Sequence, residues 1–68
     1  MTGFVLMTRS GRLFRQHPGR SDGPSVFMSQ ETAEATNVST LGGTGTVIAL
    51  ASGPVDGKRQ MDGYWLAE

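Results

Sequence analysis

The sequence predicts a small α+β protein, in which about four strands form an antiparallel sheet and a single helix packs on one face, in the order ββαββ. Two apolar segments of β-forming residues, 4–8 "FVLMT" and 46–51 "TVIALA", indicate strands. Between them, residues 29–42 begin with a helix-capping serine and end at a glycine. A helix of about eleven residues is too short to be stable alone, so it needs a sheet to pack on.

The N-terminal segment is predicted to form a hairpin. A two-residue loop of Ser10 and Gly11 would let Gly11 adopt a positive φ and would place Leu13 opposite Thr8. The stretch 17–24, "HPGRSDGP", is rich in proline and glycine and is expected to be a loop. Residues 26–28 then form either a short edge strand or an extended lead-in to the helix.

The helix has recognisable start and stop signals. Ser29 is the predicted N-cap, and Met28 before it is placed to pack against Ala33 as a hydrophobic staple. Glu31 complements the positive end of the helix dipole, and Gly42 can adopt the left-handed C-cap conformation. The face predicted to contact the sheet contains residues spaced by three: Thr32, Ala35, Val38 and Leu41.

The C-terminal third is predicted to complete the sheet. Residues 46–51 are apolar nearly throughout, which is typical of a central strand. Residues 58–66 are interpreted as one bulged strand returning along it, with the alternative that only residues 64–67 do so. The predicted core contains the apolar residues of the helix and both sheet halves: Phe27, Val38, Leu41, Val47 and Ala49, with members of Phe4, Leu6, Phe14 and Trp65.

Composition limits the classes of protein. The chain has 68 residues, of which 37% are hydrophobic and 10 are glycine, so we expect one domain (1–68) with a modest core, steadied by a partner or by homodimerisation through a sheet edge or the open sheet face. Six basic and six acidic residues cancel, which argues against broad attraction to nucleic acid or membrane. The apolar run at 4–7 is too short for a signal peptide or a membrane span, and cysteine is absent, so a cytoplasmic location is expected.

No residue pattern points to catalysis, so we expect neither an enzyme nor a bound cofactor or metal. "LGGTGTV" (41–47) follows a helix and precedes a strand, the reverse of a phosphate-binding loop. His17 is the single histidine and has no cysteine and few carboxylates to work with. Asp56 and Asp62 each precede glycine, where aspartate favours turns.

Binding is the function that the remaining side chains favour. Four arginines and no acid lie between residues 9 and 20. Such a segment could bind an anionic protein surface, could bind nucleic acid, or could be the solvated surface of an ordinary hairpin. Tyr64 and Trp65 are adjacent in a predicted strand, so one should pack under the helix and the other should stay on the open sheet face. The predicted partner-binding residues are Arg12, Arg15, Arg20, Tyr64 and Trp65.

The phrase "SVFMSQETAEA" resembles one found in small phage-encoded proteins of the anti-CRISPR and host-takeover inhibitor type. Such proteins carry a phrase V-F-x-S-x-E-x-A at a strand-to-helix junction, and the matching residues here are Val26, Phe27, Ser29, Glu31 and Ala33. The resemblance spans residues 4–51 and implies an inhibitor that occupies a surface of a larger protein. It implies no site residues, and the neutral charge argues against a nucleic-acid mimic. A small nucleic-acid-binding module that uses the arginine-rich hairpin is the alternative.

Overall fold

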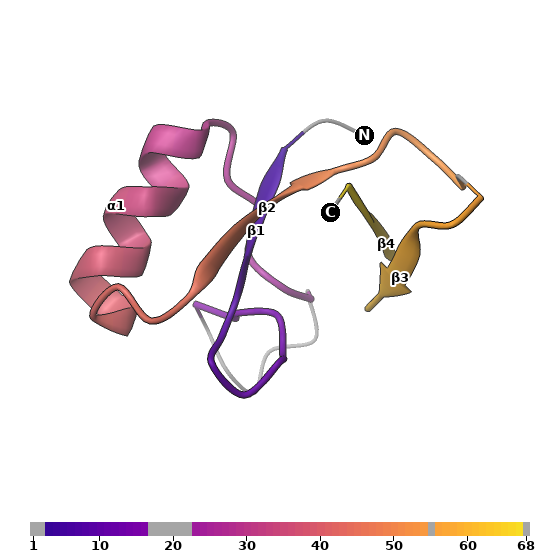
Figure 1. Ribbon diagram of the computed structural model, residues 1–68. Helices are drawn as coiled ribbons and strands as arrows, with labels where there is room; N and C mark the ends of the chain where they lie inside the picture. Colours follow the sequence, from indigo (N-terminus) through magenta and orange to yellow (C-terminus); the bar gives the residue numbers. More distant parts are fainter. Residues whose placement is uncertain (1–2, 17–22, 55, 68) are drawn as a thin grey trace.

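The computed structural model describes residues 3–16, 23–54 and 56–67, and it confirms the small α+β class (Figure 1). The chain order differs from the predicted ββαββ, because one strand precedes the helix and three follow it. The elements in order are β1 (Phe4–Met7), α1 (Gln30–Leu41), β2 (Thr46–Leu50), β3 (Arg59–Met61) and β4 (Tyr64–Ala67).

The four strands form one antiparallel sheet in the order β1-β2-β4-β3. β2 therefore lies inside the sheet, as its continuous apolar character predicted. Val5 pairs with Ile48 across β1 and β2, and Leu50 pairs with Leu66 across β2 and β4. These four side chains therefore lie on the same face of the sheet.

The predicted N-terminal hairpin is present only as a tight turn followed by one bridge, and its register is wrong by one residue. Leu13 lies opposite Met7 instead of Thr8, because the Thr8 N–H donates to the Arg12 carbonyl (2.7 Å) across a three-residue loop. Gly11 in this loop has the expected positive φ, 84°. The shift has a clear cause: it places Leu13 on the same face as the buried Val5.

Residues 26–28 were predicted to be either a short edge strand or an extended lead-in to the helix; they form no strand, but Phe27 makes an isolated bridge to the outer edge of β1. Phe4 and Phe27 exchange both backbone hydrogen bonds, each at 2.8 Å. The two segments at 12–14 and 25–27 thus cover most of the exposed edge of β1.

The C-terminal residues form a hairpin, so the preferred single bulged strand over 58–66 is wrong. β3 and β4 pair through a two-residue turn of Asp62 (φ 51°) and Gly63 (φ 87°), and only β4 returns along β2. Two consecutive positive φ angles define the turn type that matches strand twist. The Asp-Gly pair therefore ends one strand and starts another.

The helix boundaries agree with the sequence signals. The Ser29 Oγ accepts from the Thr32 N–H, and Gly42 ends the helix with a φ of 62°. The staple is wrong, because Met28 is 85% exposed; Phe27 packs in the cluster with Ala33 instead. The residue before the helix that packs with Ala33 is therefore Phe27, one position earlier than the predicted Met28.

The helix packs on the sheet through a different face from the one predicted. Its only buried residue is Ala33, and Asn37 and Leu41 lie half-buried at successive intervals of four. Val38, placed in the predicted core, is 69% exposed, and Ala35 is also exposed. Asn37 contacts the sheet side through two hydrogen bonds to the backbone of Gly45 and not through an apolar side chain. The packed face therefore has a polar residue in its middle, and hydrophobic periodicity does not identify it.

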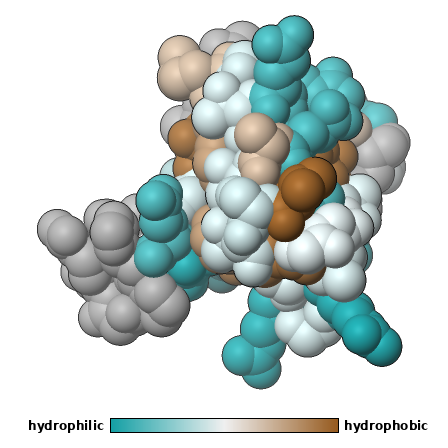
Figure 2. All heavy atoms as spheres, turned by 90° about the vertical axis from the view of Figure 1, so that its left-hand side faces the viewer, coloured by the Kyte–Doolittle hydropathy of each residue, from teal (hydrophilic) through white to brown (hydrophobic). Residues whose placement is uncertain are grey.

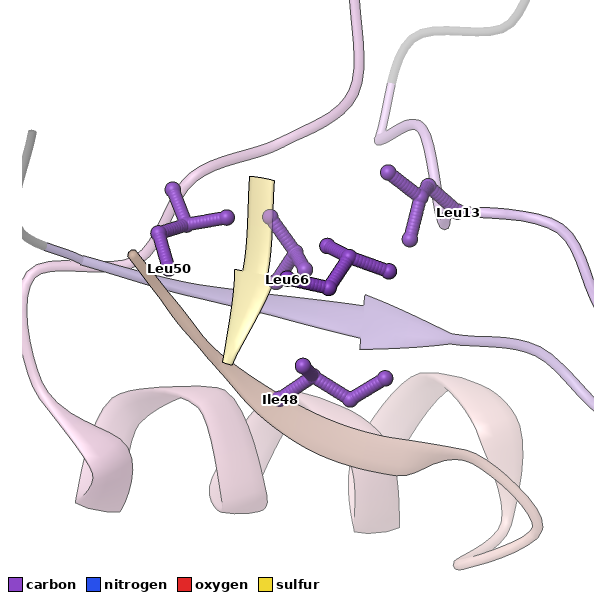
Figure 3. Close-up of a cluster of buried hydrophobic side chains, with 5 residues drawn as sticks. Leu13, Ile48, Leu50 and Leu66 are labelled. Carbon is purple, nitrogen blue, oxygen red and sulfur yellow. The ribbon is translucent and has the colours of Figure 1, made fainter. Parts of the chain in front are cut away.

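Two hydrophobic clusters form the core, one on each face of the sheet. The cluster under α1 contains Leu6, Phe27 and Ala33, with Phe4, Phe14, Leu41 and Val47 packed against it, as largely predicted. The cluster on the opposite face was not predicted. Its buried members are Val5, Leu13, Ile48, Leu50 and Leu66, and the last four are labelled in Figure 3. The prediction of an uncovered sheet face is therefore wrong.

Candidate functional site

The second cluster is buried without a covering helix because the sheet is strongly curled around it. Arg59 of β3 donates from Nη2 to the Met7 Sδ of β1 at 3.7 Å, although two strands lie between them. In a flat sheet these strands would be about 14 Å apart, at three strand spacings. The curl brings the two sides of the sheet toward each other, and α1 lies on the convex side (Figure 1).

A cleft of about 410 Å³ lies where the two sides of the curled sheet approach each other without pairing. One wall comes from the loop after β1 and contains Gly11, Arg12, Leu13 and Arg15. The other wall is the β3–β4 turn, with Met61 and Asp62. The fold therefore joins two segments about fifty residues apart in the sequence into one concave site.

The cleft combines one cationic wall, which carries Arg12 and Arg15, with the apolar side chains of Leu13 and Met61. Arg12 is exposed and Arg15 is half-buried, and no ion pair engages either of them among the residues that the structure describes. Leu13 is only 5% exposed, and Met61 packs against the same cluster. Asp62 contributes the one carboxylate of the lining. Such a site suits an anionic group attached to an apolar one.

Charges are segregated although they cancel over the whole chain. The basic residues with described positions lie on the loop after β1 or at β3, whereas α1 carries Glu31 and Glu34 and no base. Figure 2 faces the helix and shows mainly hydrophilic and neutral side chains with small apolar spots. Among the described residues, the loop after β1 is therefore basic and α1 is acidic, whereas Lys58 and Arg59 lie close in the sequence to Asp56 and Asp62.

The two aromatic residues point to opposite faces as predicted, but neither packs under the helix. Tyr64 lies opposite Met61 and packs, half-buried, against the cluster beneath the cleft. Trp65 is half-buried and lines a shallow hollow of about 180 Å³ with Ala51 and Gly53. The structure thus brings Tyr64 to the face of the arginine cleft and separates Trp65 from it.

The remaining predicted site residues have different outcomes. Arg12 and Arg15 lie together in the cleft, whereas Arg20 and His17 lie outside the described residues. Sequence reasoning missed Leu13 and Met61 as the apolar lining of the cleft and placed Asp62 only in a turn. The turn assignment is confirmed, but no local signal connects residue 62 with residues 12–15, because their proximity comes from the sheet curl.

Nothing in the described part of the chain forms a metal-binding group of three histidine, cysteine or acidic residues, and no charged side chain is buried there. No helix among the described residues has the length and apolar character to cross a membrane. Comparisons with protein-family models, curated proteins and solved structures identify no match. The function must therefore be inferred from the cleft itself.

Proposed function

We propose that the protein is a non-catalytic binding module that uses the cleft of Arg12 and Arg15 to dock on an acidic surface of a larger protein. The observation that carries this proposal is a pair of arginines that form no ion pair with any described residue and lie beside the apolar side chains of Leu13 and Met61. Arginine and half-buried aromatic residues are enriched among the residues that dominate interface energies. Tyr64 lies on the same face and extends this surface.

Steric occlusion is the proposed mode of action. A module of this kind inhibits by covering a functional surface of its partner, as the phage inhibitors with the similar strand-to-helix phrase do. The proposal does not require a metal ion, and the described residues contain no group of three histidine, cysteine or acidic residues that could hold one.

The test uses variants that separate the cleft from the rest of the basic loop. Arg12→Gln and Arg15→Gln together should reduce affinity for the physiological partner by about 100-fold, the effect of losing interface arginines. Arg9→Gln is the matched control, because Arg9 is exposed on the same loop but does not line the cleft. Affinities are measured by titration against the partner recovered by cross-linking. Equal affinities for the wild type and the double variant would refute the proposal.

Nucleic-acid binding is the second candidate. The zero net charge of the chain argues against it, but the two arginines that line the cleft favour it. Each phosphate neutralised on duplex DNA should contribute about −0.9 to the slope of log affinity against log salt. A gel-shift series at low salt that shows no complex removes this candidate. A steep slope that disappears in the double arginine variant would establish it in place of protein binding.

A further inference from the structure

The backbone N–H and C=O groups of Leu13 point away from the neighbouring strand β1. The Phe14 N–H donates to the Leu6 carbonyl (2.7 Å), and the Thr8 N–H donates to the Arg12 carbonyl (2.7 Å). In an antiparallel ladder this pattern makes Met7 and Leu13 a pair that is not hydrogen-bonded, so the N–H and C=O of Leu13 point away from β1.

Neither of these Leu13 groups has a hydrogen-bond partner within the described ranges, although the residue is 5% exposed. Backbone groups in such a position nearly always have a partner, and an extended segment from another chain supplies both the donor and the acceptor. Gln60 of β3 presents its backbone in the same way at the opposite edge, because the turn makes Met61 and Tyr64 the hydrogen-bonded pair.

We infer that the cleft takes an extended, alternating acidic and apolar peptide segment of the partner protein, which pairs with the backbone of Leu13. This inference rests on the proposed function and specifies its ligand. The carboxylates of the segment would bind Arg12 and Arg15, and its apolar side chains would lie on Leu13 and Met61.

Asp62 decides between this ligand and a nucleic acid. Asp62 lines the same cleft as the arginines, so a strand with a phosphate at every position would meet one site of like charge. An alternating peptide avoids this repulsion by directing an apolar side chain toward the turn wall. The cleft therefore favours a segment with spaced charges over a continuous polyanion.

The experiment titrates the full-length protein with two fluorescent peptides of equal charge. One alternates glutamate and valine, and the matched peptide has prolines in place of two valines, which removes backbone N–H donors. The alternating peptide should bind about tenfold more tightly than the proline peptide, because only it can complete the backbone pairing. Amide NMR spectra should show the Leu13 N–H shifting on binding and exchanging more slowly with solvent.

The outcomes distinguish the ligand from the proposed function. If both peptides bind equally well and the Leu13 N–H resonance does not shift, the inferred backbone pairing is wrong. The proposed docking on an acidic surface would still stand. Failure of both peptides at millimolar concentration also overturns the inference. If Arg12→Gln and Arg15→Gln together weaken binding no more than Arg9→Gln does, the cleft is not the binding site. The proposed function is then refuted as well. If an oligothymidylate binds more tightly than the alternating peptide, the ligand of the cleft is a nucleic acid and the peptide inference is refuted.

Discussion

The Asn37 side chain and the Gly45 backbone are joined by two hydrogen bonds that fix the helix to the sheet. Asn37 Nδ2 donates to the Gly45 carbonyl (3.0 Å), and the Gly45 N–H donates to Asn37 Oδ1 (2.8 Å). Both bonds are partly buried, and they connect the third turn of α1 with the residue before β2. This clamp sets where the chain enters the central strand.

Asn37→Ala should destabilise the protein by about 1–3 kcal/mol, because it leaves the Gly45 N–H and C=O partly buried without partners. Urea denaturation measures the free energy of unfolding. Thr40→Ala is the control: Thr40 lies exposed in the last helical turn, and alanine there should be neutral or slightly stabilising. Equal stabilities for Asn37→Ala and the wild type would contradict the clamp.

Gly45→Ala should also destabilise, here by about 1–3 kcal/mol from overpacking. A Cβ at this position would lie 2.8 Å from Leu41 Cδ1, 2.9 Å from Asn37 Oδ1 and 3.2 Å from the Met7 carbonyl oxygen. The matched substitution is Gly53→Ala, where a Cβ would meet nothing within 4 Å. If thermal melts show the same loss for both variants, the close approach at Gly45 is not the cause.

Ser29→Ala should cost about 1 kcal/mol, because the Thr32 N–H loses its acceptor at the helix N-terminus. Ser29→Asp should retain most of the stability, since its carboxylate caps the same amide and complements the helix dipole. Helical circular dichroism during thermal unfolding checks both variants. A larger loss for aspartate than for alanine would argue against capping.

Leu66→Ala tests the cluster on the helix-free face and should cost about 2–5 kcal/mol, as for a fully buried leucine. Val38→Ala is the comparison, because Val38 is the helix residue predicted as core but found 69% exposed, and it should change stability by less than about 0.5 kcal/mol. The reverse ranking in denaturant titrations would restore the core expected from the sequence and refute the curled sheet.

Asp62→Asn should strengthen the binding of acidic peptides about two- to fivefold, because it removes a like charge from the cleft wall. Asparagine tolerates the positive φ of 51° at this position, so the turn and the stability should be preserved. Fluorescence titration measures the affinity, and a thermal melt verifies the fold. Weaker peptide binding by a stably folded Asp62→Asn would show that this carboxylate assists the ligand.

Local signals in the sequence determined the elements whose causes are local. The cap at Ser29, the left-handed Gly42, the positive φ of Gly11 and the interior position of 46–50 depend on a few neighbouring residues each. The α+β class follows from these elements, because a short helix must pack on a sheet. Arg12 and Arg15 were predicted as binding residues on the same kind of local signal, because they stand out in a local run of charge.

Tertiary structure alone decided the helix face, the hairpin register and the cleft. Asn37 is a polar residue on the packed face, so hydrophobic periodicity could not identify that face. The one-residue register shift depends on Leu13 joining a cluster with Leu66, which is far away in the sequence. The curl that brings Arg12 beside Asp62 is likewise set by side chains packing across all four strands. Such contacts carry no signature in any short stretch of the chain, because packing energy is shared among distant residues.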